Sequence, residues 1–409
     1  MTELSKDFMI SNIEAKKTTQ VLEHSTLPVV FQALPKWDSD YASTSLTIAQ
    51  LLSKKRAVFY IEHPFSVVDA IKKSNRSSLS KRSGSTSQPF TEFPNFTVIH
   101  PPLIFPFNSL PNSTMYNSLM NKYLKKLWKH VDSVLIENQF DSFIYVNSFD
   151  PNFGEIQTQL SCKKKIYHCV DWIGGEEYIA KHGLASEEHF VRNLADIVIT
   201  TSEPLAKRLK KWNSNTTCIP NAADFSHFYG NHVEPDEYKS IPGKKIVYVG
   251  NIGLRIDYAL IEKTAIEHPE WSFIFVGPKD PTYFKGQELE KLNNVHFLGK
   301  RAYKDLPAYM QHADVALIPF EKSTLTEFIY PLKLNEYLAT GVPVVSSDFT
   351  DLSDFKSAID SYSSPEEFSQ KIQSAIITNS PEKKAHREFI AKLNTWENRM
   401  LFWNKYIAD

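Results

Sequence analysis

The chain has 409 residues, a length that favours two or three domains over one. Its 46 lysines and arginines balance 47 aspartates and glutamates, which argues against a dedicated nucleic-acid binder, because such proteins are markedly basic. The three cysteines form no CxxC pair, no run of 18 apolar residues occurs, and the N-terminus carries no apolar stretch of signal-peptide length. We therefore expect a cytoplasmic protein without a disulfide framework, a structural metal or a membrane span.

The first half of the chain alternates short apolar runs with helical patterns. Strands are predicted at 27–34, 56–63, 96–101, 142–148, 164–171, 196–202 and 216–221, and helices at 45–55, 115–135, 187–194 and 204–211. Nearly continuous apolar strands that alternate with helices are typical of a parallel sheet covered on both faces. The segment 72–88 is rich in Ser, Lys and Arg and is predicted to be a mobile loop.

The polar segment Gly230–Lys245 contains both Pro and Gly and is predicted to link two domains. The alternation then resumes, with strands at 245–250, 272–277, 295–299, 314–320 and 342–347, and helices at 258–268, 303–311, 332–339 and 366–378. The sequence thus predicts an α/β protein of two Rossmann-like, doubly wound domains, over residues 1–229 and 230–393. Ligands are expected outside the carboxyl ends of the strands.

In the first domain, the run KIYHCVDWIGGEE places His168 and Asp171 at the carboxyl end of a strand. Side chains at this edge of an open α/β sheet often take part in chemistry, so Asp171 is the candidate catalytic base, with His168 beside it. The alternatives are a helix cap for Asp171 and a buried strand position for His168. Asp150, which also ends a strand, is a reserve candidate.

The loop PKWDSDYASTS follows the first strand and combines aromatic rings with carboxylates. Such groups often grip sugars, so Trp37, Asp38, Asp40 and Tyr41 are candidates on the acceptor side. The alternative is a helix-entry loop that a serine caps.

The predicted helix around 115–135 interleaves lysines with apolar and aromatic residues. These are Lys122, Lys125, Lys126 and Lys129 with Tyr123, Leu127 and Trp128. A basic helix of this kind can lie on an anionic membrane surface. The alternative is an ordinary amphipathic helix with a solvated lysine face.

In the second domain, the loop GNIGLR follows the first strand. Gly250 and Gly253 let the backbone approach a phosphate next to Asn251, and Arg255 can bond to a pyrophosphate. The alternative is a plain strand–helix turn with an exposed arginine.

The segment Tyr330–Val345, YPLKLNEYLATGVPVV, carries the strongest signal for binding. Pro331 suits the start of a helix whose N-terminus can hold an anion, and Gly341 suits a left-handed cap at its end. Lys333 and Glu336 share a helix face, which suits a diphosphate and the vicinal hydroxyls of a ribose. The alternative is an ordinary surface ion pair.

This segment resembles the donor-site motif of GT-B glycosyltransferases, P-x-K-x-x-E-Y-x-A-x-G-x-P-V-V. Further resemblances occur in the family's order at PNAAD (220–224), LADIVITTSEPLAKRL (194–209), YVGNIGLRIDYALI (248–261), VHFLGKRAYKDLPAYMQHADVALIPF (295–320) and NTWENRMLFW (394–403). Together they are similar to the family 4-like, cell-envelope branch, which includes teichuronic-acid and xanthan-type transferases. Two positions depart from the family: Phe328 stands where many members have the first glutamate of E-x7-E, and Ala222 replaces a glycine.

The resemblance implies two domains that face a cleft, with a final helix, 394–409, that packs back on the first domain. It implies transfer of a sugar from a nucleoside-diphosphate sugar to a hydroxyl of a glycan or lipid-linked acceptor, in cell-envelope or exopolysaccharide biosynthesis. Glu336 would hold the ribose. The diphosphate would be held by Lys333, Arg255 and the backbone near Gly250 and Leu332, and the chain around Arg301 would lie beside the base.

We expect no cofactor and no metal, because no D-x-D cluster in a strand context is evident. The expected partners are the donor, the acceptor and, through the basic helix, the inner face of the cytoplasmic membrane. Two other function classes stay open, a nucleotide-sugar epimerase on the same fold and a non-catalytic two-lobed sugar-binding protein. The base, the sugar and the stereochemistry of transfer are likewise open.

Overall fold

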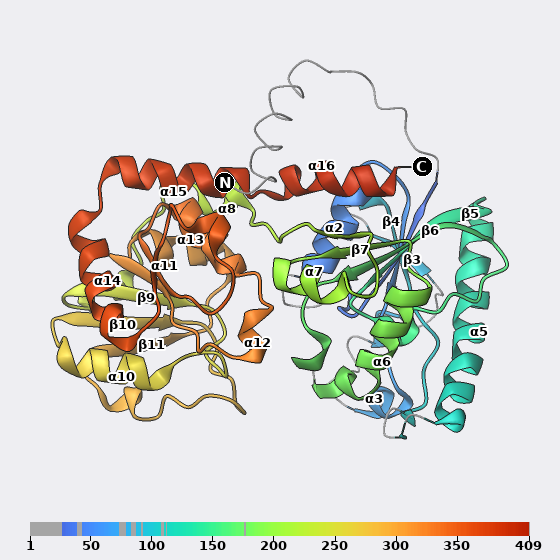
Figure 1. Cartoon of the computed structure of the whole chain (residues 1–409), viewed down its shortest axis with the longest axis horizontal. Coiled ribbons are helices and arrows are strands. Elements are labelled where there is room, and N and C mark those ends of the chain that lie inside the picture. Colours follow the sequence, from blue (N-terminus) through green and yellow to red (C-terminus); the bar gives the residue numbers. More distant parts are fainter. Residues whose placement is uncertain are drawn as a thin grey trace, which may run out of the picture. The chain divides into compact units, whose positions relative to one another are not determined.

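The computed structural model of the chain describes residues 27–38, 43–72, 79–82, 87–90, 93–107, 110–111, 113–175 and 177–408. These residues form an N-terminal unit, residues 27–220 with 400–408, and a C-terminal unit, residues 221–399. Each unit is a sheet flanked by helices (Figure 1), and the predicted α/β fold with two Rossmann-like domains is confirmed.

The N-terminal unit is built on a sheet in the order β3-β4-β2-β1-β5-β6-β7-β8. Neighbouring strands are parallel, except that β3 and β4 are antiparallel. Every residue of β1 and β2 is buried, because helices cover both faces of the sheet. The strands are β1 (Val29–Ala33), β2 (Val58–Glu62), β3 (Ser87–Phe90), β4 (Phe93–Ile99), β5 (Ser142–Ser148), β6 (Ser161–Cys169), β7 (Ile197–Thr200) and β8 (Thr216–Cys218).

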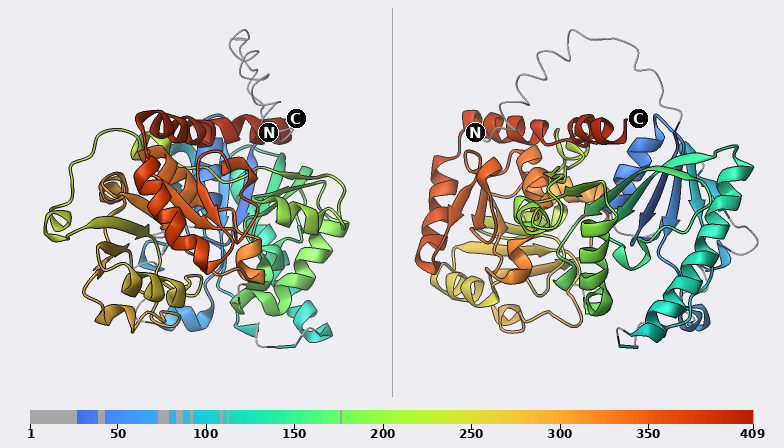
Figure 2. Two further views of the ribbon diagram at one scale, coloured as in Figure 1. Left: turned by 60° about the vertical axis from the view of Figure 1, so that its left-hand side comes forward. Right: turned by 45° about the vertical axis from the view of Figure 1, so that its right-hand side comes forward.

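Helices were predicted where α2, α5 and α7 lie, whereas α6 begins ten residues before the predicted start at 187 and α3 was not predicted. Figure 2 shows α5 as a long helix beside the sheet. Tyr123, Leu127 and Trp128 of α5 are buried, whereas its lysines are exposed. The helices are α2 (Thr44–Ser53), α3 (Val67–Ile71), α5 (Thr114–Glu137), η3 (Pro151–Phe153), η4 (Ile173–Gly175), α6 (Glu177–Asn193) and α7 (Glu203–Leu209).

The C-terminal unit is built on a parallel sheet in the order β11-β10-β9-β12-β13-β14. Its strands are β9 (Lys244–Val249), β10 (Trp271–Val276), β11 (Val295–Gly299), β12 (Val315–Ile318), β13 (Val344–Ser347) and β14 (Asp360–Tyr362). Its helices are α8 (Phe225–Phe228), α9 (Asp236–Ser240), α10 (Tyr258–Glu267), η5 (Leu289–Lys291), η6 (Tyr303–Asp305), α11 (Leu306–Gln311), α12 (Thr324–Glu327), α13 (Leu332–Thr340), η7 (Ser353–Phe355), α14 (Pro365–Thr378) and α15 (Pro381–Leu393).

Each sheet contains one switch point, at which the strands that follow in the sequence are added on the other side of the first strand. In the N-terminal sheet β1 lies between β2 and β5, and in the C-terminal sheet β9 lies between β10 and β12. In open parallel sheets, ligands bind outside the carboxyl ends of the strands at such switch points. The loops after β1 and β9, with their neighbours, are therefore the places to look for a site.

The last helix, α16 (Trp396–Ile407), contributes its final two turns to the N-terminal unit. Trp403 is buried and meets the ring of His168 edge-on at 5.0 Å. The Arg56 guanidinium donates to the Ile407 carbonyl at 3.0 Å, and the Lys164 amine donates to the Tyr406 carbonyl at 3.1 Å. The C-terminal end of the chain is thus part of the core of the unit that begins with β1.

The predicted linker 230–245 is wrong, because this segment belongs to the C-terminal unit. It contains α9, whose Tyr238 is buried in the core and donates a hydrogen bond to the Tyr309 carbonyl at 2.8 Å. The unit also begins earlier than expected, after Pro220, since Phe228 of α8 is buried in the same core. The sequence could not reveal this, because a short polar segment held by the burial of one aromatic ring shows no hydrophobic periodicity.

The segment predicted as a loop, 72–88, is only partly described, since 73–78 and 83–86 lie outside the described residues. Within the described parts, Ser87 and Gln88 belong to β3, and Arg82 is buried against acidic side chains. The loop prediction is therefore wrong for Ser87 and Gln88, whereas Arg82 lies in a turn that its ion pairs hold in place.

Candidate functional site

The loop after β9 brings the backbone against Lys333 of α13. Gly250 has a φ of 146°, a value that favours glycine, and its N–H donates to the Val276 carbonyl at 2.9 Å. A Cβ atom at this position would lie 2.2 Å from Cε of Lys333 and 2.9 Å from its Nζ. Only a glycine here leaves room for the lysine amine to lie directly over the backbone of the loop.

The neighbouring loop after β10 packs tightly on this one. A Cβ atom on Gly277 would lie 1.9 Å from the Gly250 carbonyl oxygen. The Tyr248 hydroxyl donates to the Asn251 carbonyl at 2.9 Å, and the Asn251 amide approaches the Asp280 carboxylate at 3.4 Å. These contacts hold the Gly250 loop in one conformation.

Helix α13 begins after Pro331 and ends at Gly341, whose φ of 76° is the predicted left-handed cap. The N–H of Leu332 donates to the Tyr330 carbonyl at 2.9 Å, and that of Leu334 donates to the Pro331 carbonyl at 2.9 Å. The Leu332 amide, which was predicted to help hold the diphosphate, therefore already donates a hydrogen bond within the chain.

Lys333, Glu336 and Arg255 form one electrostatic group on this edge of the sheet. The Lys333 and Glu336 side chains are half-buried. Burial lowers the pKa of Lys333, an effect that Glu336 opposes and the Arg255 charge adds to. Burial raises the pKa of Glu336 to about 7, against the opposing charge of Lys333. A cation and a carboxylate one turn apart, beside a glycine loop, can hold a diphosphate and a pair of hydroxyls.

The Arg301 side chain, predicted to lie beside the base, is paired with Glu237 and Tyr309. Its guanidinium donates to Glu237 Oε1 at 2.8 Å and to the Tyr309 hydroxyl at 2.9 Å. Tyr303, in the same loop, lies close enough to Glu336 to feel its charge. Burial raises the pKa of Tyr303, and the charges of Glu336 and Asp224 raise it further. The prediction for the Arg301 loop missed this ring, although Tyr303 stood in the quoted motif.

Tyr303 is suited to a planar ligand. Its ring stacks on His227 with centroids 4.2 Å apart and planes 6° apart, and 47% of the residue is exposed. The His227 Nε2 atom lies 3.0 Å from the Tyr303 carbonyl, which holds the pair together.

In the N-terminal unit, the structure contradicts the catalytic role predicted for His168. This residue is fully buried on β6, its Nδ1 lies 2.8 Å from the Ser148 hydroxyl, and Trp403 covers its edge. Burial lowers the pKa of His168 to about 3. A group that no solvent or substrate reaches cannot take a proton from an acceptor, so His168 is a core residue.

Asp171 follows β6 and is half-buried. Its Oδ1 accepts a hydrogen bond from the Trp172 N–H at 2.8 Å, just before η4. Gly174 allows the Trp172 ring to lie over the turn, since a Cβ there would lie 2.4 Å from the indole. This bond runs to the next residue and is not that of a helix cap, in which the side chain accepts from an N–H two or three positions later. The catalytic role of Asp171 stays a prediction.

Of the four candidates on the acceptor side, the structure describes Trp37 and Asp38. Trp37 packs beside Arg82, whose guanidinium carbon lies 5.6 Å from the indole ring. Asp38 accepts two hydrogen bonds from the same guanidinium, at 2.7 and 3.1 Å. Asp40 and Tyr41 lie outside the described residues. The Asp38 carboxylate is thus occupied by Arg82, which the sequence had placed in a loop.

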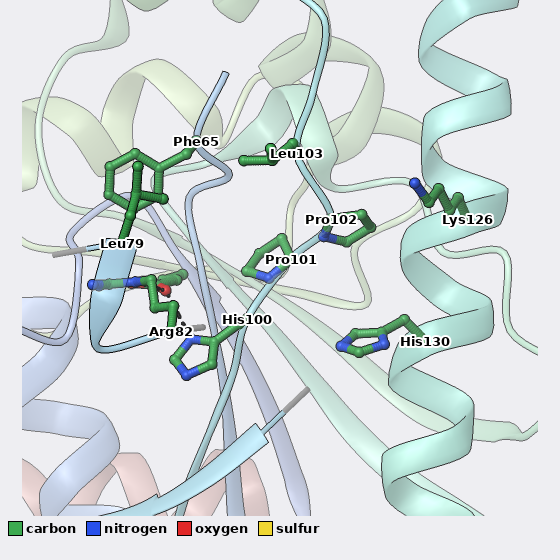
Figure 3. Close-up of a pocket in the computed structure, with 10 residues that line it drawn as sticks. Phe65, Leu79, Arg82, His100, Pro101, Pro102, Leu103, Lys126 and His130 are labelled. Atoms are coloured by element: carbon green, nitrogen blue, oxygen red, sulfur yellow. Dashed lines mark hydrogen bonds and ion pairs between the residues drawn. The ribbon is translucent and has the colours of Figure 1, made fainter. Parts of the chain in front are cut away.

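Arg82 joins this loop to a pocket of about 390 Å³ at the carboxyl ends of β2 and β4. Its Nε donates to Glu62 Oε1 at 2.6 Å, and His100 Nδ1 lies 3.0 Å from the same oxygen. Figure 3 shows Arg82 and His100 on one side of the pocket and Lys126 and His130, from α5, on the other. The remaining lining is Glu62, Phe65, Leu79, Pro101, Pro102 and Leu103.

A second polar pair lies at the same edge of the sheet, and the sequence had pointed to only one of its two members. His63, the residue after β2, places Nδ1 3.2 Å from Oδ1 of Asp150. Asp150 was a reserve candidate and His63 was not considered. The two are 87 positions apart in the chain, so no spacing rule joins them.

Within the described ranges, no three His, Cys, Asp or Glu side chains are grouped so as to hold a metal ion. The same part of the chain contains no helix long and apolar enough to cross a bilayer.

Comparisons with known proteins agree with this geometry. Residues 243–377, which carry the Gly250 loop, Lys333 and Glu336, match the family model of glycosyl transferases group 1. TuaH of Bacillus subtilis strain 168, named for a glycosyltransferase role in teichuronic acid biosynthesis, is 29% identical over 214 residues, which cover 48% of this chain and 54% of TuaH. The match thus spans about half of that relative.

Several solved structures match nearly the whole chain, among them the following two. Sucrose-phosphate synthase from Thermosynechococcus elongatus superposes with a TM-score of 0.66 at 16% identity, over 93% of this chain and 98% of its own. The Anabaena protein HepE, solved in complex with UDP, superposes with a TM-score of 0.63 at 14% identity, over 93% and 99%. The fold is the GT-B fold, and the resemblance to GT-B glycosyltransferases is confirmed.

Proposed function

We propose that this protein is a glycosyltransferase that moves a sugar from a nucleoside-diphosphate sugar to a hydroxyl of a glycan or lipid-linked acceptor in cell-envelope polysaccharide biosynthesis. One observation carries the proposal: the Lys333 amine lies over the backbone of Gly250, with Glu336 one turn further along α13. This arrangement stands at the switch point of the C-terminal sheet, in the segment that matches the group 1 family.

In this proposal the donor lies along the carboxyl edge of β9. Lys333 and Arg255 bind the diphosphate and stabilise the charge that develops on it as the sugar leaves. The ionised Glu336 accepts hydrogen bonds from two ribose hydroxyls, and the base stacks on the exposed face of Tyr303. We propose that these cations do the work without a metal ion, so that the transfer rate should be unchanged by EDTA. An EDTA-sensitive rate would refute this part.

The donor site is tested by thermal shift with UDP, GDP, ADP and TDP. One diphosphate is expected to raise the melting temperature, and Glu336→Gln should remove most of that rise. Glu267→Gln, on the exposed end of α10 in the same unit, is the matched control and should respond like the parent. If all four nucleotides leave the parent's melting temperature unchanged, or if Glu336→Gln behaves like the control, the site is wrong.

For the acceptor, we propose the pocket that Arg82, His100, Lys126 and His130 line. Arg82 and His100 are already paired with Glu62, so the Lys126 amine, beside Pro101 and Pro102, is the cation that favours a sugar ring with an anionic group. Transfer to p-nitrophenyl glucuronide should then be faster than to p-nitrophenyl glucoside, and Lys126→Gln should reduce that preference severalfold. Lys122→Gln, one turn away and outside the pocket lining, is the control. Equal rates for both glycosides would contradict the assignment.

We also propose peripheral contact with an anionic membrane. The aromatic side chains of α5 are buried and cannot insert, which matches the alternative of an amphipathic helix with a solvated lysine face. Exposed apolar side chains nearby include Leu103 and Phe105, in a segment that the Tyr123 hydroxyl of α5 holds through the Pro102 carbonyl, and Met115 in the first turn of α5. Sedimentation with phosphatidylglycerol vesicles, but not with phosphatidylcholine vesicles, is expected, and Phe105→Ser should weaken it. Equal sedimentation with both lipids would contradict the role of the lysines.

A further inference from the structure

The C-terminal sheet is split at its switch point. β9 pairs with β10 along its whole length, as far as Val249, but its pairing with β12 ends at Val247. β12 itself continues and pairs with β13 through Ile318. The ends of β9 and β12 therefore diverge, and the split between them lies directly before the Gly250 loop of the proposed donor site.

The divergence leaves the buried backbone of Val249 without a strand partner on the β12 side. The Lys245 carbonyl, four residues earlier in β9, accepts a hydrogen bond from the Asp314 N–H, just before β12. The Gly250 N–H donates instead to the Val276 carbonyl of β10. Successive residues of a strand point their backbone groups to alternate neighbours, so the N–H and C=O of Val249 face β12. Buried groups of this kind need another partner.

The hydroxyl of Tyr337 supplies both bonds. It accepts from the Val249 N–H at 2.9 Å and donates to the Val249 carbonyl at 3.4 Å. Tyr337 is fully buried, so solvent does not compete for its hydroxyl. A side chain of α13 thus takes the place of a sheet partner at the strand end that leads into Gly250.

The same face of α13 carries the two charged residues of the proposed donor site. Lys333 lies one turn before Tyr337, and Glu336 lies one turn after Lys333. The Lys333 chain approaches the loop so closely that a Cβ atom on Gly250 would lie 2.2 Å from its Cε. Even a small displacement of α13 relative to β9 would therefore change the place of the lysine amine over the loop.

Other contacts hold the glycine loop against the sheet and leave α13 out. The far end of the loop pairs with the extension of β12, where the Glu321 N–H donates to the Arg255 carbonyl at 2.8 Å. Ile256 forms a bridge with Phe320 in the same place. These bonds fix the loop relative to β12, whereas the two bonds of Tyr337 join α13 directly to the end of β9.

We propose that Tyr337 is a positioning residue of the donor site, an inference that rests on the nucleotide binding proposed above. Its hydroxyl fixes α13 against the end of β9 and so holds the Lys333 amine and the Gly250 backbone at the spacing that binds a diphosphate. Phenylalanine would keep the ring but leave the N–H and C=O of Val249 unpaired, and the strand end would shift toward other partners. The effect reaches the ligand through Lys333, because Tyr337 itself is buried.

Isothermal titration calorimetry with the nucleoside diphosphate selected by thermal shift measures this effect. Tyr337→Phe should raise the dissociation constant at least tenfold. Tyr238→Phe is the matched control, because the Tyr238 hydroxyl is also buried in this unit and donates to the Tyr309 carbonyl at 2.8 Å. It should change the dissociation constant less than twofold, although both variants lose a buried hydrogen bond and should melt at a lower temperature.

A double-mutant cycle separates positioning from a general loss of packing. If Tyr337 acts through Lys333, adding Tyr337→Phe to Lys333→Gln should raise the dissociation constant less than threefold further. A merely structural role would give the same factor in both backgrounds. Hydrogen exchange measured by mass spectrometry is an independent check. Without nucleotide, the peptide 246–253 should exchange faster in Tyr337→Phe than in the parent and at the parent's rate in Tyr238→Phe.

The outcomes distinguish this inference from the proposed function. The role of Tyr337 is overturned, while the donor site stands, if Tyr337→Phe binds the nucleotide like the parent, weakens binding by the same factor in both backgrounds, or leaves the exchange of 246–253 unchanged. A Tyr337→Phe variant that does not fold would also overturn it, since the hydroxyl would then serve the stability of the unit. A parent that binds none of the four nucleotides would overturn the donor site and this inference with it.

Discussion

At the residue scale, the donor site depends on the protonation of one carboxyl group. Burial raises the pKa of Glu336 to about 7, so this group is half protonated near neutral pH. The ionised form offers one charged oxygen to each ribose hydroxyl, whereas in the protonated form one oxygen carries the proton and both bonds are weaker. Nucleotide binding must therefore shift the group toward the carboxylate, and the cost of that shift grows as the pH falls.

The affinity for the selected nucleoside diphosphate is accordingly expected to rise with pH up to about 8 and to fall about tenfold for each unit below 7. Isothermal titration calorimetry between pH 5.5 and 8.5 measures this dependence. Glu336→Gln removes the titrating group and leaves only the ionisation of the phosphate itself. Parallel profiles for parent and variant would show that Glu336 does not contact the nucleotide.

A second prediction at this scale concerns Gly250. Gly250→Ala places a methyl group against the Lys333 chain at a positive φ, which should cost about 1–3 kcal/mol of stability and weaken nucleotide binding at least tenfold. Gly230→Ala is the matched control, because its φ of 131° imposes similar strain with nothing within 4 Å. Urea denaturation and calorimetry should show both variants destabilised and only Gly250→Ala impaired in binding.

At the element scale, α16 joins the end of the chain to the core of the first unit. Thr395 caps this helix, since its hydroxyl accepts from the Asn398 N–H at 3.3 Å. The last two turns then bury Trp403 and Ile407. This explains why His168, at the middle of the N-terminal sheet, is a packing residue.

Trp403→Ala should therefore lower the free energy of unfolding by about 3–5 kcal/mol, the usual cost of removing a buried aromatic ring. Leu401→Ala, two positions away and 53% exposed, should change it by less than about 0.5 kcal/mol. Urea denaturation followed by tryptophan fluorescence compares the two. A small loss for Trp403→Ala would mean that the end of α16 detaches from the sheet at little cost.

At the scale of the whole molecule, the chain has two cores, and it passes between the units after Pro220 and again after Arg399. The proposed nucleotide contacts belong to the C-terminal unit alone. A ligand at 100 times its dissociation constant stabilises the unit that binds it by about 2.7 kcal/mol. Differential scanning calorimetry should show the selected nucleotide raising one unfolding transition and leaving the other in place. Equal shifts of all transitions would show that the two units unfold together.

The sequence alone was sufficient for the two Rossmann-like domains, and it named Lys333, Glu336 and Gly250, whose role in donor binding stays a prediction. The hydrophobic periodicity of strands and helices, and a motif within one helix, are local patterns that can be recognised in a short stretch of sequence. Only the tertiary structure decided the rest. It moved residues 230–245 from a linker into a domain through the buried Tyr238, occupied Asp38 with Arg82 and buried His168 under Trp403. It also brought His63 to Asp150. Each of these depends on which strands are neighbours, and that order is set by packing between segments far apart in the chain.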